Sequence, residues 1–177
     1  MEFIQNIDNN ILIFIQNNIR CAFLDVVMPI ITSFGDAGIT WIIAAIIMLC
    51  NSKYRNYGII LVITLICGYT LCEYIIKPIV GRIRPCNVNP LIQMLISKPT
   101  TYSFPSGHSF NSFSSSVIIY KTNKFLGKVA FILAALIAFS RMYLYVHYPS
   151  DVLCGIIMGI CFAFIIYRLF EMRLIKK

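Results

Sequence analysis

The stretch Tyr57–Ile76, YGIILVITLICGYTLCEYII, decides the fold class, because its only charged side chain is that of Glu73. A helix needs roughly 20 consecutive, mostly apolar residues to cross a bilayer, and this run has that length. Further apolar runs follow along the chain, separated mainly by short polar connectors. They are Ile39–Cys50, Phe104–Tyr120, Val129–Val146 and Val152–Phe170. We therefore predict an all-α, polytopic membrane protein.

The composition supports this class along the whole chain. Of its 177 residues, 59% are hydrophobic and 12% are charged, and the mean hydropathy is +0.80. These values lie far from those of ordinary soluble domains. Because the apolar runs leave no room for a separate soluble domain, we expect residues 1–177 to form one membrane domain in the cell membrane.

The N-terminal segment has a different pattern. Ile4, Ile7, Ile11 and Ile15 recur at helical spacing, and asparagines lie between them, so residues 1–20 are amphipathic but too polar to span. We expect an N-terminal interfacial helix. The segment is not a cleavable signal peptide, because it carries acidic residues in place of a basic start and no small-residue cleavage site follows.

Two further segments complete the predicted topology. Cys21–Phe34 contains Asp25 and Pro29, but the turn-forming Gly35–Gly38 that follows indicates that the chain crosses and then reverses, giving a sixth transmembrane helix. Residues 77–103 form a long outer connector with a short helix at Leu91–Ile96. Four prolines break regular helix in this connector: Pro78, Pro85, Pro90 and Pro99.

The positions of lysine and arginine predict the orientation, because cytoplasmic loops carry an excess of both. Three basic groups fall on one side of a six-span layout, which places both termini in the cytoplasm. They are Lys53 with Arg55, then Lys121, Lys124 and Lys128, and finally Arg173, Lys176 and Lys177. The outer side receives the His147–Ser150 junction and four cations that oppose this bias: Lys77, Arg82, Arg84 and Lys98.

The net charge and the cysteines exclude other classes. The formal charge of +8 does not indicate a nucleic-acid partner, because the basic residues cluster at the ends of apolar spans instead of on one polar face. The seven cysteines include no C-x-x-C pair, and most lie within apolar runs, where a thiol packs as a small hydrophobe. We expect neither zinc sites nor disulfides.

Ionisable residues from four predicted helices gather at the outer edge, where charges are expensive unless they face a polar site. They are Lys77, Arg84, His108, Arg141, His147 and Asp151. Three cations, two imidazoles and a carboxylate suit an anion such as phosphate, together with acid–base chemistry. His147 and Asp151 are spaced so that the carboxylate can accept a hydrogen bond from the imidazole N–H and leave the other ring nitrogen free.

Each residue alone also has a structural explanation. Lys77 can extend to the interface, Arg84 can be an ordinary loop residue, and Ser106 can simply cap a helix. The serines after His108 favour close helix packing. His147 beside Asp151 is, by itself, equally well explained as a surface histidine near a helix start. Arg141 is harder to explain without an anionic partner.

Three strings together resemble the signature motifs of the type 2 phosphatidic acid phosphatase (PAP2) superfamily, in order and spacing. They are KPIVGRIRP at Lys77–Pro85, PSGH at Pro105–His108 and SRMYLYVHYPSD at Ser140–Asp151. The resemblance implies that His147 attacks phosphorus, that Asp151 hydrogen-bonds to it and that His108 serves as acid and then base. The implied phosphate-binding residues are Lys77, Arg84, Ser106, Gly107 and Arg141.

This resemblance implies a metal-independent lipid phosphatase without a cofactor, working at the membrane surface on a lipid phosphate among membrane lipids. The compact, outward-facing form resembles bacterial undecaprenyl-diphosphate phosphatases, in which Arg82 and Lys98 could bind a second phosphate. Phosphatidylglycerophosphate, phosphatidic acid and diacylglycerol pyrophosphate remain alternative substrates, and a lipid phosphotransferase is a second enzymatic hypothesis. A small transporter is disfavoured because the inner halves of the spans are almost purely apolar.

Overall fold

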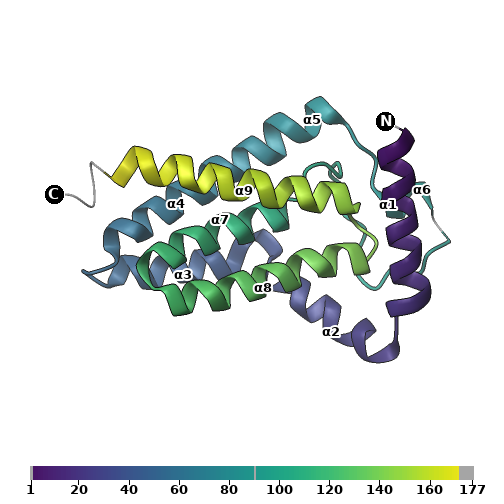
Figure 1. Cartoon of the computed structure of the whole chain (residues 1–177), viewed down its shortest axis with the longest axis horizontal. Coiled ribbons are helices and arrows are strands. Elements are labelled where there is room, and N and C mark those ends of the chain that lie inside the picture. The colour runs from purple at the N-terminus through teal and green to yellow at the C-terminus, as the bar shows by residue number, and fades with distance from the viewer. Residues whose placement is uncertain (1, 90, 172–177) are drawn as a thin grey trace.

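The computed structural model describes residues 2–89 and 91–171, and it shows a bundle of helices with one helix lying across its end (Figure 1). The bundle helices run roughly side by side along the longest axis and are α3 (Ile39–Cys50), α4 (Arg55–Tyr69), α7 (Gly107–Thr122), α8 (Lys124–Tyr143) and α9 (Pro149–Phe170). These described ranges contain no strand, so the all-α prediction is confirmed.

The serine-rich helix α7 occupies the centre of the bundle and packs against α8, α9 and α4. Its buried serines leave little side-chain bulk: Ser109, Ser112, Ser114, Ser115 and Ser116. On α9, Gly155 and Gly159 lie against the backbone of α7, and an added Cβ would fall 2.6 Å from Ser106 O and 2.5 Å from Phe110 O. Small residues on both helices therefore permit this close approach.

Three stretches are long and apolar enough to cross a membrane, namely Arg55–Val88, Lys124–Tyr143 and Pro149–Phe170. The bent pair Ala22–Ser33 and Asp36–Cys50 can supply a fourth. Helix α7, with 16 residues, is shorter than these stretches, and its serines also make it less apolar. The chain is a multi-pass membrane protein with three or four candidate spans among its described residues, and the six predicted spans are not confirmed.

The reversal predicted at Gly35–Gly38 is wrong. Helix α2 (Ala22–Ser33) continues into α3 with a bend of 42°, so the two helices proceed in broadly the same direction. Left-handed backbone at Ala37 (φ 51°) and Gly38 (φ 69°) produces this kink, in a string that the sequence presents as an ordinary turn. As a result, α1 and the end of α9 lie at opposite ends of the bundle (Figure 1), which removes the basis for placing both termini on one side.

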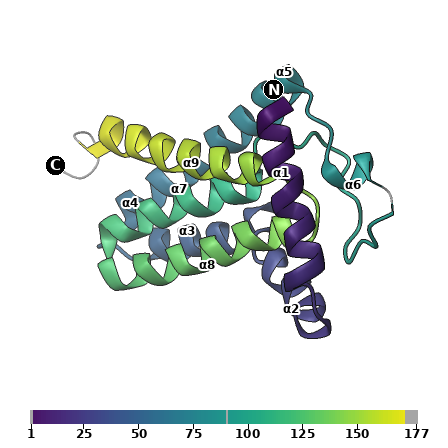
Figure 2. The same ribbon diagram turned by 45° about the vertical axis from the view of Figure 1, so that its right-hand side comes forward.

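Helix α1 (Glu2–Phe14), extended by a π-helical turn at Ile15–Ile19, crosses the end of the bundle (Figure 2). Its inward face carries Asp8 and Leu12, followed by Ile15. The first three isoleucines of the predicted apolar stripe point outward instead, with Ile4 57%, Ile7 43% and Ile11 39% exposed, and only Ile15 is buried. The face that docks on the protein is therefore not the one that periodicity marks as apolar.

The connector after α4 starts with a π-helical segment, Thr70–Ile76, followed by the short helices α5 (Lys77–Val80) and α6 (Pro85–Val88). The short helix predicted at Leu91–Ile96 is wrong, since that segment is irregular. The helix forms at Pro85 instead, because proline is favourable at a first helical position. Pro90 and the basic residues Arg173, Lys176 and Lys177 lie outside the described residues. All seven cysteines are free thiols.

Candidate active site

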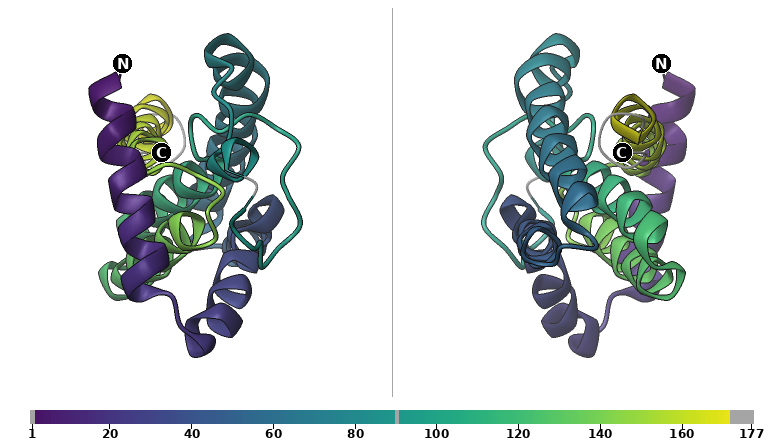
Figure 3. Two further views of the ribbon diagram at one scale, coloured as in Figure 1. Left: turned by 90° about the vertical axis from the view of Figure 1, so that its right-hand side faces the viewer. Right: turned by 90° about the vertical axis from the view of Figure 1, so that its left-hand side faces the viewer.

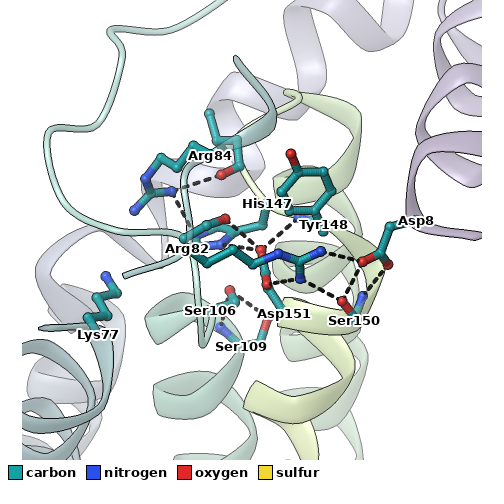
Figure 4. Close-up of polar contacts among 12 residues, drawn as sticks. Asp8, Lys77, Arg82, Arg84, Ser106, Ser109, His147, Tyr148, Ser150 and Asp151 are labelled. Atoms are coloured by element: carbon teal, nitrogen blue, oxygen red, sulfur yellow. Dashed lines mark hydrogen bonds and ion pairs between the residues drawn. The ribbon is translucent and has the colours of Figure 1, made fainter. Parts of the chain in front are cut away.

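Most of the predicted site residues are seen near one another at the end of the bundle that α1 crosses, namely Lys77, Arg84, Ser106, His147 and Asp151 (Figure 4). Seen end-on, α1 lies on one side of this end and the connector lies on the other (Figure 3). The starts of α5, α6, α7 and α9 and the end of α8 all meet here. The six ionisable residues predicted from sequence are thereby brought to one level, and five of them are buried: Lys77, Arg84, Arg141, His147 and Asp151.

His147 lies in the loop between α8 and α9, and Arg84 Nη1 is 3.0 Å from its Nε2. A guanidinium only donates hydrogen bonds, so Nε2 must be the unprotonated acceptor and Nδ1 carries the proton. Nδ1 is 3.6 Å from Asp151 Oδ2 and has no hydrogen-bond partner among the described residues. The carboxylate thus faces the imidazole at ion-pair distance, slightly too far for the predicted hydrogen bond.

The electrostatic surroundings keep His147 neutral. Burial lowers the pKa of His147 well below its ordinary value of 6.5, and the positive charges of Arg84, Arg141 and Lys77 lower it further. A neutral imidazole with a lone pair on Nε2 is the form that can attack phosphorus.

Arg84 and Lys77 are fixed by the connector. Arg84 Nε donates to Thr101 O at 2.7 Å, and its Nη1 donates to Val146 O at 2.9 Å. Lys77 Nζ donates to Thr101 Oγ1 at 3.2 Å and forms an ion pair with Glu73. Glu73 therefore orients one cation of the site, and Thr101 links both cations.

A cavity of about 440 Å³ has His108 and Arg141 in its wall, together with Thr32 and Asp36. Arg141 Nη1 donates to Thr32 Oγ1 at 2.6 Å, while the buried Arg141 Nε has no partner among the described residues. His108 Nε2 is 2.9 Å from Asp36 Oδ1. A buried, unpaired guanidinium donor next to an imidazole suits an anion that accepts from both.

Helix α2 thus contributes Thr32, and the bend after it contributes Asp36, both of which the sequence reasoning missed. No local signal marks Thr32. Asp36 belongs to the string interpreted as a turn, and only the 42° bend places its carboxylate at His108.

The start of α7 combines a structural and a chemical feature. Ser106 caps the helix, accepting from Ser109 N at 3.4 Å and from Ser109 Oγ at 3.0 Å, so the capping explanation holds. Ser106 N donates to Asp151 O at 3.1 Å, which joins α7 to α9. The free N–H groups that follow at the helix start are suited to bind an anion.

Asp151 is held by three groups other than His147. Its Oδ1 accepts from Arg82 Nη1 at 2.6 Å, and its Oδ2 accepts from Ser103 Oγ at 2.5 Å and from Tyr148 N at 2.9 Å. Arg82, which was predicted to contact a second phosphate, is already paired with carboxylates. Its guanidinium instead lies between Asp151 and Asp8, the latter from α1 at 2.7 Å, because two carboxylates compete for it.

Among residues 2–89 and 91–171, no group of three or more histidine, cysteine or acidic side chains is placed to hold a metal ion. The site's charge comes from cationic side chains instead. Metal-independent chemistry remains a prediction.

A membrane-embedded helical bundle gathers three cations, two histidines and a buried aspartate at one end, and two of these residues, His108 and Arg141, line a cavity. This arrangement is that of a phosphate-ester hydrolase acting at a membrane surface. The chain belongs to the PAP2 superfamily, whose family model matches residues 53–175. The resemblance seen in the three motifs is thereby confirmed, and the chain is a membrane lipid phosphatase of this family.

Relatives of known function and structure agree. An undecaprenyl-diphosphatase from Sulfolobus acidocaldarius is 33% identical over 98% of this chain and 84% of its own length. Phosphatidylglycerophosphatase B from Bacillus subtilis is 32% identical over 84% of this chain and 76% of its own length. The crystal structure of a PAP2-type phosphatidylglycerolphosphate phosphatase from Bacillus subtilis has a TM-score of 0.79 and 27% identity, covering 100% of this chain and 90% of that one.

Proposed function

We propose that this enzyme hydrolyses the phosphate end of a polyprenyl lipid, best matched by undecaprenyl diphosphate, through a phosphohistidine at His147. The observation that carries the proposal is the environment of His147. The ring is buried, its Nε2 is unprotonated and faces Arg84, and its Nδ1 faces Asp151.

In the first step, His147 Nε2 forms a bond to phosphorus while the bond from phosphorus to the leaving oxygen breaks. His108 donates a proton to that oxygen. Asp151 stabilises the positive charge that develops on the His147 ring. Arg84 shifts its donor from Nε2 to a phosphoryl oxygen, since the nitrogen lone pair is consumed in the attack.

In the second step, His108 accepts a proton from water, the water oxygen bonds to phosphorus, and the N–P bond breaks to release inorganic phosphate. The phosphate-binding residues offset the charge spread over the phosphoryl oxygens. They are Lys77, Arg84 and Arg141 through side-chain donors, and Ser106 and Gly107 at the start of α7.

The choice of lipid rests on the relatives and on one cation. The Sulfolobus acidocaldarius relative is an undecaprenyl-diphosphatase, which supports a diphosphate substrate. Lys98 is exposed and lies between Ser97 and Pro99, which both line the cavity, so it is placed to meet a second phosphate. The Bacillus subtilis relative supports phosphatidylglycerophosphate as the alternative, and a phosphotransferase would use the same phosphohistidine.

We further propose a revised topology for the single membrane domain. The bent pair α2–α3 counts as one crossing, and α4, α7, α8 and α9 supply the others, so that five crossings replace six. Lys53, Arg55 and the lysines between α7 and α8 mark the cytoplasmic side. The site and α1 then face outward, with α1 in the interface plane, its isoleucine stripe toward lipid and the C-terminus in the cytoplasm.

The test is phosphate release by purified enzyme from undecaprenyl diphosphate, phosphatidylglycerophosphate and phosphatidic acid in parallel. His147→Ala should abolish release, and ³²P should be trapped on the parent protein in an alkali-stable, acid-labile form. Arg84→Met should lose activity, whereas the matched Arg55→Met at the far end should keep it. Equal turnover of the three lipids would refute a carrier-lipid role, and phosphate release only when an acceptor lipid is added would indicate a phosphotransferase.

A further inference from the structure

We infer that Asp8, on the interfacial helix α1, is a positioning residue for catalysis, acting through Arg82 on Asp151 and so on His147. This inference rests on the proposed role of His147. It assigns a function to two residues outside the cavity and explains why α1 is docked at this end of the bundle.

Asp8 is a buried, fully hydrogen-bonded carboxylate, although it lies on an amphipathic helix. The residue is 2% exposed. Its Oδ1 accepts from Ser150 N at 2.9 Å, and its Oδ2 accepts from Ser150 Oγ at 2.5 Å and from Arg82 Nη2 at 2.7 Å. A buried carboxylate without such donors would be strongly unfavourable, so this position is specified by the partners that it meets.

Arg82 connects this carboxylate to the site. Its Nη1 donates to Asp151 Oδ1 at 2.6 Å and to Ser150 Oγ at 2.7 Å. Its Nη2 donates to Asp8 and, at 2.8 Å, to Gln5 Oε1. The guanidinium carbon of Arg82 lies 4.0 Å from the centroid of the Tyr148 ring, and this stacking also fixes the orientation of the guanidinium plane (Figure 4).

The charges give this arrangement a consequence for His147. Arg82 alone would neutralise Asp151 and weaken its attraction for a positively charged imidazole. Asp8 shares the guanidinium, so that the group of Asp8, Arg82 and Asp151 keeps one net negative charge next to His147. That charge favours the transition state, in which the ring becomes cationic.

Asp8 also fixes the start of α9, because its carboxylate accepts the backbone N–H of Ser150 in the first turn. Asp151 is the next residue. The seating of α1 therefore sets both the charge and the position of the carboxylate that faces His147.

The experiment reads the protonation of His147 without substrate. The chain has two histidines, so a His108→Asn background leaves His147 as the only imidazole, and its ¹⁵N shifts report its pKa directly. The other ionisable groups around it stay in place throughout, and they are Arg84, Arg141, Lys77 and Asp151.

We expect Asp8→Asn to lower the pKa of His147 and Arg82→Gln to raise it, each by roughly half to one pH unit. The double variant should return close to the parent, because it removes one charge of each sign. Opposite shifts of this kind do not arise from loosened packing. In the otherwise native chain, Asp8→Asn should reduce kcat about tenfold with little change in KM.

Two variants on α1 serve as controls. Glu2→Gln makes the same charge change at an exposed position and should alter neither the pKa nor kcat. Leu12→Ala removes apolar contacts of α1 but leaves every charge in place, so it should lower the melting temperature and shift the pKa of His147 far less than Asp8→Asn does.

Shifts in the same direction for Asp8→Asn and Arg82→Gln, or no shift in either, would overturn the inference. If Asp8→Asn does not fold, two results still decide the question: the direction in which Arg82→Gln shifts the pKa of His147, and the return of that pKa toward the parent value in the double variant. Phosphate release that survives His147→Ala would instead remove the proposed function, whatever the pKa values are.

Discussion

Replacing Gly155 with alanine tests whether the contact between α7 and α9 sets the geometry of the site. The added Cβ would fall 2.6 Å from Ser106 O, whereas ordinary contact begins at 3.4 Å. The backbones of the two helices must therefore separate by about 0.8 Å at this point. Ser106 starts the helix that bears His108, and Asp151 lies one turn before Gly155, so this movement separates the two halves of the site.

The expected effect on catalysis follows from that displacement. A misplacement of about 1 Å between reacting groups costs up to a hundredfold in rate, so we expect kcat to fall by roughly ten- to a hundredfold in Gly155→Ala. Overpacking should also lower the free energy of unfolding by about 1–3 kcal/mol, partly offset by the better helix propensity of alanine.

The assay is kcat and KM on a short-chain lipid phosphate, together with thermal unfolding followed by the fluorescence of Trp41. This residue is the single tryptophan of the chain, and its Nε1 donates to Ser112 of α7 at 3.1 Å. Gly127→Ala is the matched control, because its Cβ would fall 2.3 Å from Tyr120 Cα at the opposite end of α7. It should lower the melting temperature and preserve kcat. Equal kcat in the two variants would refute the reasoning.

Three further predictions concern the site chemistry. Asp36→Asn removes the carboxylate 2.9 Å from His108 Nε2. The kcat should then fall about tenfold for lipid phosphates and little for an aryl phosphate, whose leaving group needs no proton. An equal loss on both substrates would exclude a role of Asp36 in supporting His108 as the acid. Prolonged treatment with a chelator should leave activity unchanged, because cations of the protein supply the charge, and a loss restored only by a divalent ion would contradict this. Burial holds the pKa of His147 well below 6.5, so the nucleophile stays neutral as the pH falls. The value of kcat/KM should therefore stay constant from about pH 7.5 to about pH 6.5. A decrease in kcat/KM toward low pH, centred near pH 7 for both monoester and diphosphate substrates, would disprove this prediction.

The sequence by itself determined the class of the protein and the members of the site. Long apolar runs can be buried only in a bilayer or in a large protein core. Because the runs extend along most of this 177-residue chain, they predict a helical membrane protein before any fold is known. Charged residues at the ends of those runs must share a level. For this reason His108, Arg141 and His147 could be placed together from their positions in the chain alone, and the family motifs added their roles.

Only the tertiary structure decided how these residues are supported. Asp8 and Arg82 are separated by 74 positions and meet because α1 crosses the bundle end, an arrangement that no local period encodes. Asp8, Leu12 and Ile15 do share a helical face, but the helical spacing of the exposed Ile4, Ile7 and Ile11 hides that signal. The string Gly35–Gly38 fits both a reversal and a bend, since the same left-handed residues serve either. The choice depends on what α2 packs against, and it places Asp36 next to His108 and puts α1 and the end of α9 at opposite ends of the bundle.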